Sequence, residues 1–115
     1  RFAEVETDED GMVISRLEKA LEENPGAKLI YIVPDFQNPT GTDLEPGKKA
    51  SACRAFAKYN VVVIEDNPYG ELRYEGDFLP SVKSFDKEGN VLCTGTFSKI
   101  FCPGYRIGWI AGKKR

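Results

Sequence analysis

Three continuous apolar runs, separated by segments of other character, constrain the fold of this chain more than any other feature. The runs are KLIYIVP (28–34), VVVIED (61–66) and VLCTGTFS (91–98), which are rich in β-branched and aromatic residues. Such runs are typical of strands that are buried on both faces of a parallel sheet. Strands that alternate with helices predict βαβ units, so we expect an α/β fold, with a partial doubly wound, mainly parallel sheet and flanking helices.

Two helices are expected, one before the first run and one after it. The first is expected over residues 11–23, with Asp10 as its candidate N-cap and a stop at Asn24-Pro25-Gly26. Its apolar positions approximate helical spacing: Met12, Ile14, Leu17 and Leu21. The second is expected to run from a capping box at 42–45 to about Tyr59. The positions expected to be buried in it are Ala50, Cys53 and Phe56 or Ala57.

The remaining segments are expected to be short strands or irregular chain. FAEVE (2–6) is a candidate short strand, and IGWIAG (107–112) is a candidate fourth strand of the sheet. The segment 67–89 is rich in turn-forming residues, so we expect turns and short irregular pieces there.

Composition excludes several classes of function. The 115 residues suffice for one small domain, and the net charge of -2 gives no basic footprint for nucleic acid. No apolar run approaches the roughly 20 residues that a membrane span needs. The chain has no histidine, which removes Ser-His and Cys-His nucleophile pairs. Three cysteines without C-x-x-C spacing fit free thiols in a reducing compartment, so we expect a cytoplasmic protein.

Polar side chains follow each of the three apolar runs. Asn38 follows the first run. Asp66 ends the second and is followed by Tyr69, and Ser98 ends the third and is followed by Lys99. In open α/β sheets, ligands bind at the carboxyl ends of the strands. We therefore expect these side chains to face one crevice at that edge of the sheet.

Each of these side-chain types can perform a task that one small molecule requires. A lysine amine can form a Schiff base with an aldehyde, and an aspartate can pair with a protonated ring nitrogen. Asparagine and tyrosine can hydrogen-bond a phenolate oxygen, while Thr96, Ser98 and Arg106 can bind a phosphate. Pyridoxal 5'-phosphate (PLP) carries all four groups, so this set of side chains favours a PLP site.

Three ordered motifs carry a family resemblance. They are VPDFQNPTG (33–41), VVVIEDNPYGELRYEG (61–76) and GTFSKIFCPGYRIGW (95–109). With these motifs the chain resembles the fold-type I PLP enzymes, specifically the class I/II aminotransferases. It is most similar to the branch that holds α-aminoadipate, kynurenine and aromatic aminotransferases. Aminotransferase-like transcriptional regulators also lie near this branch.

The resemblance assigns a role to each motif residue. It implies that Lys99 holds PLP as a Schiff base and, once the substrate amine has displaced it, moves a proton. It implies that Asp66 keeps the pyridine nitrogen protonated. The other implied contacts are Asn38 and Tyr69 with the 3-oxygen, and Ser98, Thr96 and Arg106 with the phosphate. Thr96 stands where the family often has serine, so the hydroxyl is kept and a methyl group is added.

The resemblance also implies a domain context. Residues 1–115 would be an internal fragment of the large PLP-binding domain, with the small domain and the N-terminal part absent. The parent protein is expected to be a homodimer that transfers an amino group between an α-amino acid and a 2-oxo acid, with no nucleic acid at this segment and no membrane. The isolated piece is expected to be inactive. Two alternatives stay open: an effector domain of a PLP-dependent transcriptional regulator, and a PLP-dependent lyase.

Overall fold

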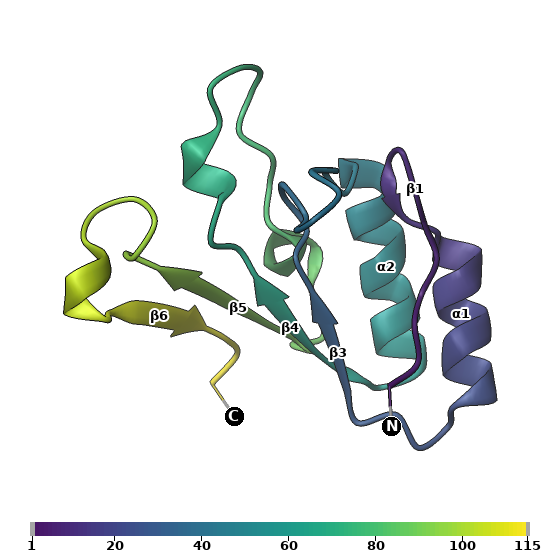
Figure 1. Ribbon diagram of the computed structural model, residues 1–115. Helices are drawn as coiled ribbons and strands as arrows, with labels where there is room; N and C mark the ends of the chain where they lie inside the picture. The colour runs from purple at the N-terminus through teal and green to yellow at the C-terminus, as the bar shows by residue number, and fades with distance from the viewer. Residues whose placement is uncertain (1, 115) are drawn as a thin grey trace.

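The computed structural model describes residues 2–114, and its centre is a four-stranded sheet (Figure 1). The strands are β3 (Leu29–Ile32), β4 (Val62–Asp66), β5 (Val91–Thr96) and β6 (Gly108–Ala111), which are neighbours in that order. The pairs β3–β4 and β4–β5 are parallel, and β6 runs antiparallel to β5. This arrangement confirms the expected α/β fold with a mainly parallel sheet.

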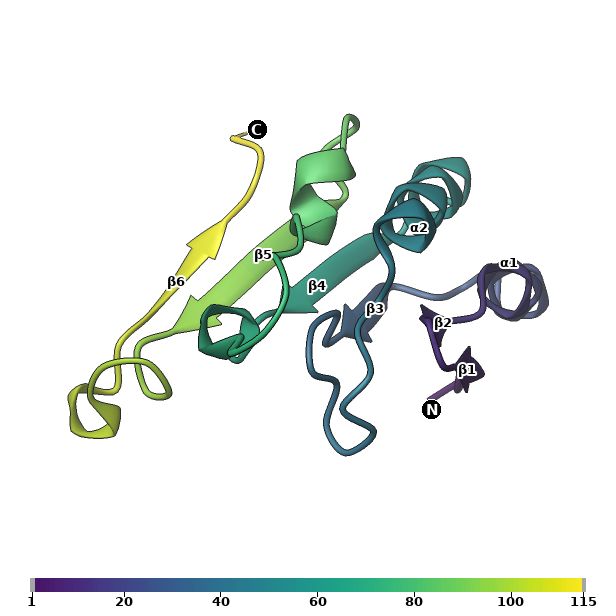
Figure 2. The same ribbon diagram turned by 90° about the horizontal axis from the view of Figure 1, so that it is seen from above.

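The helices α1 (Ile14–Glu23) and α2 (Pro46–Lys58) lie side by side on one face of the sheet (Figures 1 and 2). The core lies between this helical layer and the strands. Its fully buried apolar side chains include Leu17, Phe56, Val63, Val82 and Val91. Within residues 2–114, neither helix is long and apolar enough to cross a membrane.

The expectation that the apolar runs are buried on both faces is wrong for this chain. Along β4 the side chains alternate between buried and half-buried, and along β3 Leu29 and Tyr31 are exposed. Successive side chains of a strand point to opposite faces of the sheet. Because α1 and α2 cover one face, the other face of the described chain stays open.

The N-terminal expectations are also wrong in part. Residues 2–6 form no strand; instead β1 (Thr7–Asp8) and β2 (Gly11–Met12) form a small antiparallel hairpin. Gly11 permits this turn because its φ is +92°, a left-handed value that glycine adopts without strain. Since the hairpin occupies residues up to 12, α1 begins only at Ile14, and its N-cap is Val13 rather than Asp10. The expected stop after residue 23 is confirmed.

The expected position of the second helix is confirmed, but the capping box expected at 42–45 does not form its cap. The N-cap of α2 is Glu45, whose side chain accepts a hydrogen bond from the Lys48 backbone N–H at 3.0 Å. Thr42 instead belongs to the preceding loop. The helix ends at Lys58 with Tyr59 as C-cap, as expected. Cys53 and Phe56 are buried, while Ala50 and Ala57 are half-buried.

The segment between β4 and β5 is irregular, as expected, and contains two short 3₁₀ helices, η1 (Gly70–Leu72) and η2 (Val82–Phe85). Asp86 closes the turn that leads into β5. Its carboxylate accepts hydrogen bonds from the backbone N–H groups of Gly89, Asn90 and Val91 at 2.8–3.1 Å, and from Lys83 Nζ at 2.8 Å. Burial opposes ionisation of this carboxyl, but Lys83 and the three N–H groups outweigh it and hold the pKa of Asp86 at about 2.

Asp86 is therefore expected to make stability depend on acid pH. An aspartate in the unfolded chain has a pKa of about 3.9. The stabilisation of the folded state by the Asp86 carboxylate is therefore complete above about pH 4 and is lost as the pH falls toward about 2. We expect Asp86→Asn to lower the free energy of unfolding by about 2 kcal/mol at pH 7 and by much less at pH 2. Urea unfolding at both pH values checks this, with the exposed Asp77→Asn as control. An equal deficit at both pH values would contradict it.

Candidate functional site

The loops that follow β3, β4 and β5 leave the sheet at the same edge (Figure 1). Asp66 is the last residue of β4, and Thr96 is the last residue of β5. Tyr69 directly precedes η1, while Ser98 and Lys99 lie in the turn after β5. The remaining two predicted residues are Asn38, in the loop after β3, and Arg106, the C-cap of η3 (Pro103–Tyr105).

Asp66 is the best-held member of the predicted set. Its Oδ2 accepts a hydrogen bond from Tyr31 Oη at 2.5 Å, and its Oδ1 accepts one from Thr94 Oγ1 at 3.2 Å. The sheet register explains both contacts. Thr94 pairs directly with Asp66 across β4–β5, and Tyr31 pairs with Ile64, which shares a sheet face with Asp66. The carboxylate is thus fixed from both neighbouring strands.

The titration of Tyr31 reflects this contact. The hydrogen bond to Asp66, followed by burial and the charges of Asp66 and Tyr69, raises the pKa of Tyr31 to about 12. The phenol therefore keeps its proton and stays a donor through the neutral range.

The turn after β5 brings Thr96 and Ser98 together, since the Ser98 backbone N–H donates to Thr96 Oγ1 at 3.1 Å. The loop between β5 and β6 is closed by a backbone hydrogen bond from Phe97 N to Ile107 O at 3.0 Å. This bond holds the two ends of the loop that carries Lys99 and Arg106.

Three predicted residues have exposed side chains: Asn38, Lys99 and Arg106. Within residues 2–114, no hydrogen bond joins these three to one another or to Asp66. The structure therefore places them at one edge of the sheet without a direct contact, and their shared role stays a prediction. Arg106 has a φ of +53°, in the left-handed region that residues other than glycine rarely adopt.

The chemical types of the side chains at this edge match the groups of a phosphorylated aromatic aldehyde. Lys99 supplies a solvent-exposed primary amine, the group that forms a Schiff base with an aldehyde. Asp66 offers a carboxylate acceptor that two neutral donors already hold. The hydroxyls of Thr96 and Ser98 and the guanidinium of Arg106 supply donors for a phosphate.

A buried ion pair behind the site was missed by the sequence reasoning. Lys49 Nζ donates to Asp35 Oδ1 at 2.7 Å, and the side chains are 0% and 3% exposed. Lys49 also donates to the Pro80 carbonyl at 3.0 Å, and Asn67 Nδ2 donates to Asp35 Oδ2 at 3.2 Å. This cluster ties the loop after β3 to the loop after β4, and these loops carry Asn38 and Tyr69.

A second buried carboxylate, Glu65, was also missed. It accepts hydrogen bonds from the backbone N–H groups of Val82 and Lys83 at 2.7 and 2.8 Å. Burial raises the pKa of Glu65, and these two donors oppose that rise. The contact fastens η2 to β4, so the return of the chain toward β5 is fixed next to the strand that ends in Asp66.

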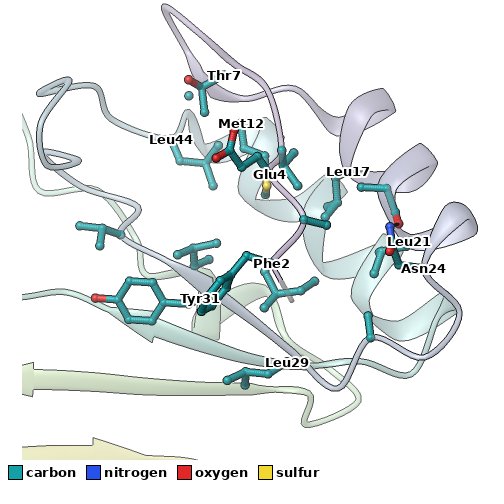
Figure 3. A pocket seen from close by; sticks show the side chains of 18 of the residues that line it. Phe2, Glu4, Thr7, Met12, Leu17, Leu21, Asn24, Leu29, Tyr31 and Leu44 are labelled. Atoms are coloured by element: carbon teal, nitrogen blue, oxygen red, sulfur yellow. Dashed lines mark hydrogen bonds between the residues drawn. The ribbon is translucent and has the colours of Figure 1, made fainter.

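An open apolar groove adjoins the site between α1, β3 and the N-terminal segment (Figure 3). Leu17, Leu21 and Leu29 are among its lining side chains. Figure 3 shows Tyr31 at one end of the groove, with its hydroxyl directed away from these leucines. Tyr31 and Asn38 thus line both the groove and the predicted site.

Comparison with known proteins gives a consistent result. A family model for aminotransferase class I and II matches residues 2–115. The aromatic-amino-acid aminotransferase 1 of Thermococcus litoralis is 40% identical over 116 residues, covering 97% of this chain and 28% of that protein. A crystal structure of Pyrococcus horikoshii kynurenine aminotransferase, in complex with PMP, superposes with a TM-score of 0.88 at 41% identity, covering 94% of this chain and 28% of that one.

A regulator matches as well. An HTH-type transcriptional regulator of Bacillus subtilis, YisV, is 41% identical over 87 residues, covering 76% of this chain and 18% of that protein. The chain spans 28% of the length of the aminotransferases named above.

Proposed function

Because the chain belongs to the class I and II aminotransferase family, we propose that the protein carrying it transfers an amino group between an α-amino acid and a 2-oxo acid. PLP, when bound, supplies an electron sink that stabilises negative charge at the substrate Cα. The residues that would hold PLP are those of the predicted set: Asn38, Asp66, Tyr69, Thr96, Ser98, Lys99 and Arg106.

The chain's own residues have separate tasks in this proposal. Lys99 holds the cofactor aldehyde in the resting protein, and its Nζ later accepts the proton that leaves the substrate Cα. Asp66 presents a negative charge to the ring nitrogen. Ser98 and Arg106 anchor the phosphate, the arginine through its planar pair of N–H donors.

The proposal rests on the hydrogen bonds of the Asp66 carboxylate. An aspartate at the end of a central strand, with each oxygen held by a neutral hydroxyl, keeps an oriented charge for a cationic partner. Among residues 2–114, the side-chain partners of Asp66 are Tyr31 and Thr94, and both are neutral. Asp66 would thus present its negative charge to a protonated ring nitrogen.

Asp66→Asn is the direct test of this role. Asparagine keeps the shape and can still accept from Tyr31, but it carries no charge. We expect kcat for transamination to fall by about 100-fold or more, the scale of losing one oriented electrostatic contact to developing charge. Steady-state kinetics with aromatic amino donors and 2-oxoglutarate measures it, and Asp77→Asn serves as the exposed control. Activity within threefold of wild type would overturn the assignment.

The similarity to YisV supports one alternative, an effector domain that binds PLP or an amino acid to control a DNA-binding domain. The same site would serve both functions. Measured turnover of amino donor and 2-oxo acid by the protein carrying this chain favours the enzyme. PLP binding without turnover favours the effector domain.

The proposal extends to the setting of the protein. By analogy with the family, we propose that it is a cytoplasmic homodimer. Sedimentation of the purified protein measures its assembly state, and a monomer with full activity would contradict the dimer.

A further inference from the structure

The two hydrogen bonds that hold Asp66 are not equivalent. Thr94 Oγ1 lies 3.2 Å from Asp66 Oδ1 and also 3.2 Å from the Glu65 carbonyl oxygen. A threonine hydroxyl has one proton, so it can donate to one of these acceptors at a time. Within residues 2–114, Tyr31 Oη donates to Asp66 Oδ2 alone, at 2.5 Å. The undivided bond to the carboxylate is therefore the one from Tyr31.

Among the residues that the structure describes, packing does not account for the position of the Tyr31 phenol. The residue is 60% exposed, on the open face of the sheet. An exposed tyrosine ring on an edge strand gains little from burial, so the hydrogen bond is the contact that fixes its hydroxyl. The backbone places the ring correctly because Tyr31 pairs with Ile64, two residues before Asp66 on the same strand face.

We propose that Tyr31 is a positioning residue that fixes the carboxylate of Asp66 for its cationic partner; this inference rests on the proposed function. An ionised aspartate has two oxygens with about four lone-pair sites and can rotate about χ2. The phenol occupies one site on Oδ2 and restrains that rotation. Without it, Thr94 alone holds the carboxylate, and it shares its proton with the backbone.

The chain offers a matched control for this contact. Tyr59 Oη donates to Glu22 Oε1 at 2.8 Å, joining α2 to α1 on the helical face of the molecule. Tyr59→Phe removes the same kind of phenol–carboxylate bond as Tyr31→Phe, but away from the site. Effects that appear in Tyr31→Phe and not in Tyr59→Phe therefore belong to Asp66 rather than to general loss of a hydrogen bond.

The first measurement needs no cofactor. The protein carrying this chain is labelled with ¹³C at the tyrosine ring carbons, and the signal absent from Tyr31→Phe is followed against pH by NMR. We expect its pKa at about 12 in wild type and a return toward about 10 in Asp66→Asn. The charged and titratable groups that act on this phenol are Asp66 and Tyr69. A Tyr31 that titrates near 10 in wild type overturns the proposal.

The second measurement uses PLP as the probe. We expect Tyr31→Phe to raise the dissociation constant of PLP by about two- to tenfold, the range of one net hydrogen bond. We also expect the ring-nitrogen signal of bound ¹⁵N-PLP to shift relative to wild type and to Tyr59→Phe. A purely structural role for Tyr31 would leave that signal unchanged.

The outcomes separate this proposal from the proposed function. If wild type binds PLP and Tyr31→Phe matches Tyr59→Phe in affinity and nitrogen shift, the Tyr31 proposal is overturned while the proposed function stands. If wild type binds no PLP, the proposed function is overturned and the Tyr31 proposal with it, whatever the tyrosine titration shows.

Discussion

The Lys99→Ala variant is expected to transaminate about 10²- to 10⁴-fold more slowly than wild type, the range attributed to one positioned acid–base group. Lys99 is the lysine in the turn directly after β5, with an exposed side chain beside the strand that neighbours Asp66. Alanine removes both the amine that holds the cofactor aldehyde and the group that accepts the Cα proton. Steady-state rates with an amino-acid donor and a 2-oxo acid measure the loss.

Lys87→Ala is the matched control for this loss. Lys87 is another exposed lysine, but it lies in the turn before β5, away from the carboxyl ends of the strands. We expect Lys87→Ala to keep the wild-type rate and the wild-type affinity for PLP. A Lys99→Ala variant that keeps more than a tenth of the wild-type kcat would contradict the role given to Lys99.

The Lys49→Met variant is expected to lower the free energy of unfolding by about 3–5 kcal/mol, the cost of leaving one partner of a buried ion pair without the other. Methionine fills a similar length of the core, so the loss arises from charge rather than from a cavity. Asp35 would keep one side-chain donor, Asn67, and the Pro80 carbonyl would lose its lysine. Urea unfolding of the protein carrying this chain measures the change.

Lys58→Met is the control on the same helix, because Lys58 is 59% exposed and lies 4.0 Å from Glu18. Exposed ion pairs contribute about 0–1 kcal/mol, so this variant should differ little from wild type. We further expect Lys49→Met to weaken PLP binding under folding conditions, because the loops that carry Asn38 and Tyr69 lose their common anchor. Equal stability of the two variants would show that the Asp35–Lys49 pair contributes nothing to the fold.

The sheet and its carboxyl edge were predictable because their signals are local. Runs such as VVVIED favour a strand by composition alone, and a polar residue at the end of a run marks the strand end. Asp66 ends β4 and Tyr69 follows three residues later, as these patterns placed them. β5 ends at Thr96, two residues before the end of the expected strand. Because β3, β4 and β5 run parallel, their carboxyl ends lie at the same edge of the sheet.

The N-terminal hairpin was not predictable from local spacing. The apolar positions at 12 and 14 fit a helical pattern, but Gly11 turns the chain into β2 before the helix starts. Tertiary contact decides this, since a side chain at Gly11 would meet the Leu44 backbone at 3.0 Å. The loop after β3 packs there, and its position is not encoded in residues 7–14.

The residues that support the site, Tyr31, Asp35 and Lys49, could not be predicted from local sequence, although the position of Lys49 indicates its burial. Lys49 occupies the apolar stripe of α2, with Ala52, Cys53 and Phe56 three, four and seven residues later. A lysine in such a stripe indicates a buried charge that needs a partner. The partner, Asp35, is known only from the fold. Tyr31 likewise meets Asp66 only through the register of β3 on β4.

If this edge of the sheet organises PLP, the cofactor will react with Lys99 in preference to the other lysines. PLP is added to the protein carrying this chain, the mixture is reduced with borohydride, and the adduct is mapped by peptide mass spectrometry. We expect one pyridoxyl adduct, on Lys99, that is absent from Lys99→Ala and weakened in Asp66→Asn. Adducts scattered over exposed lysines such as Lys28 and Lys87, with none enriched at Lys99, would contradict it.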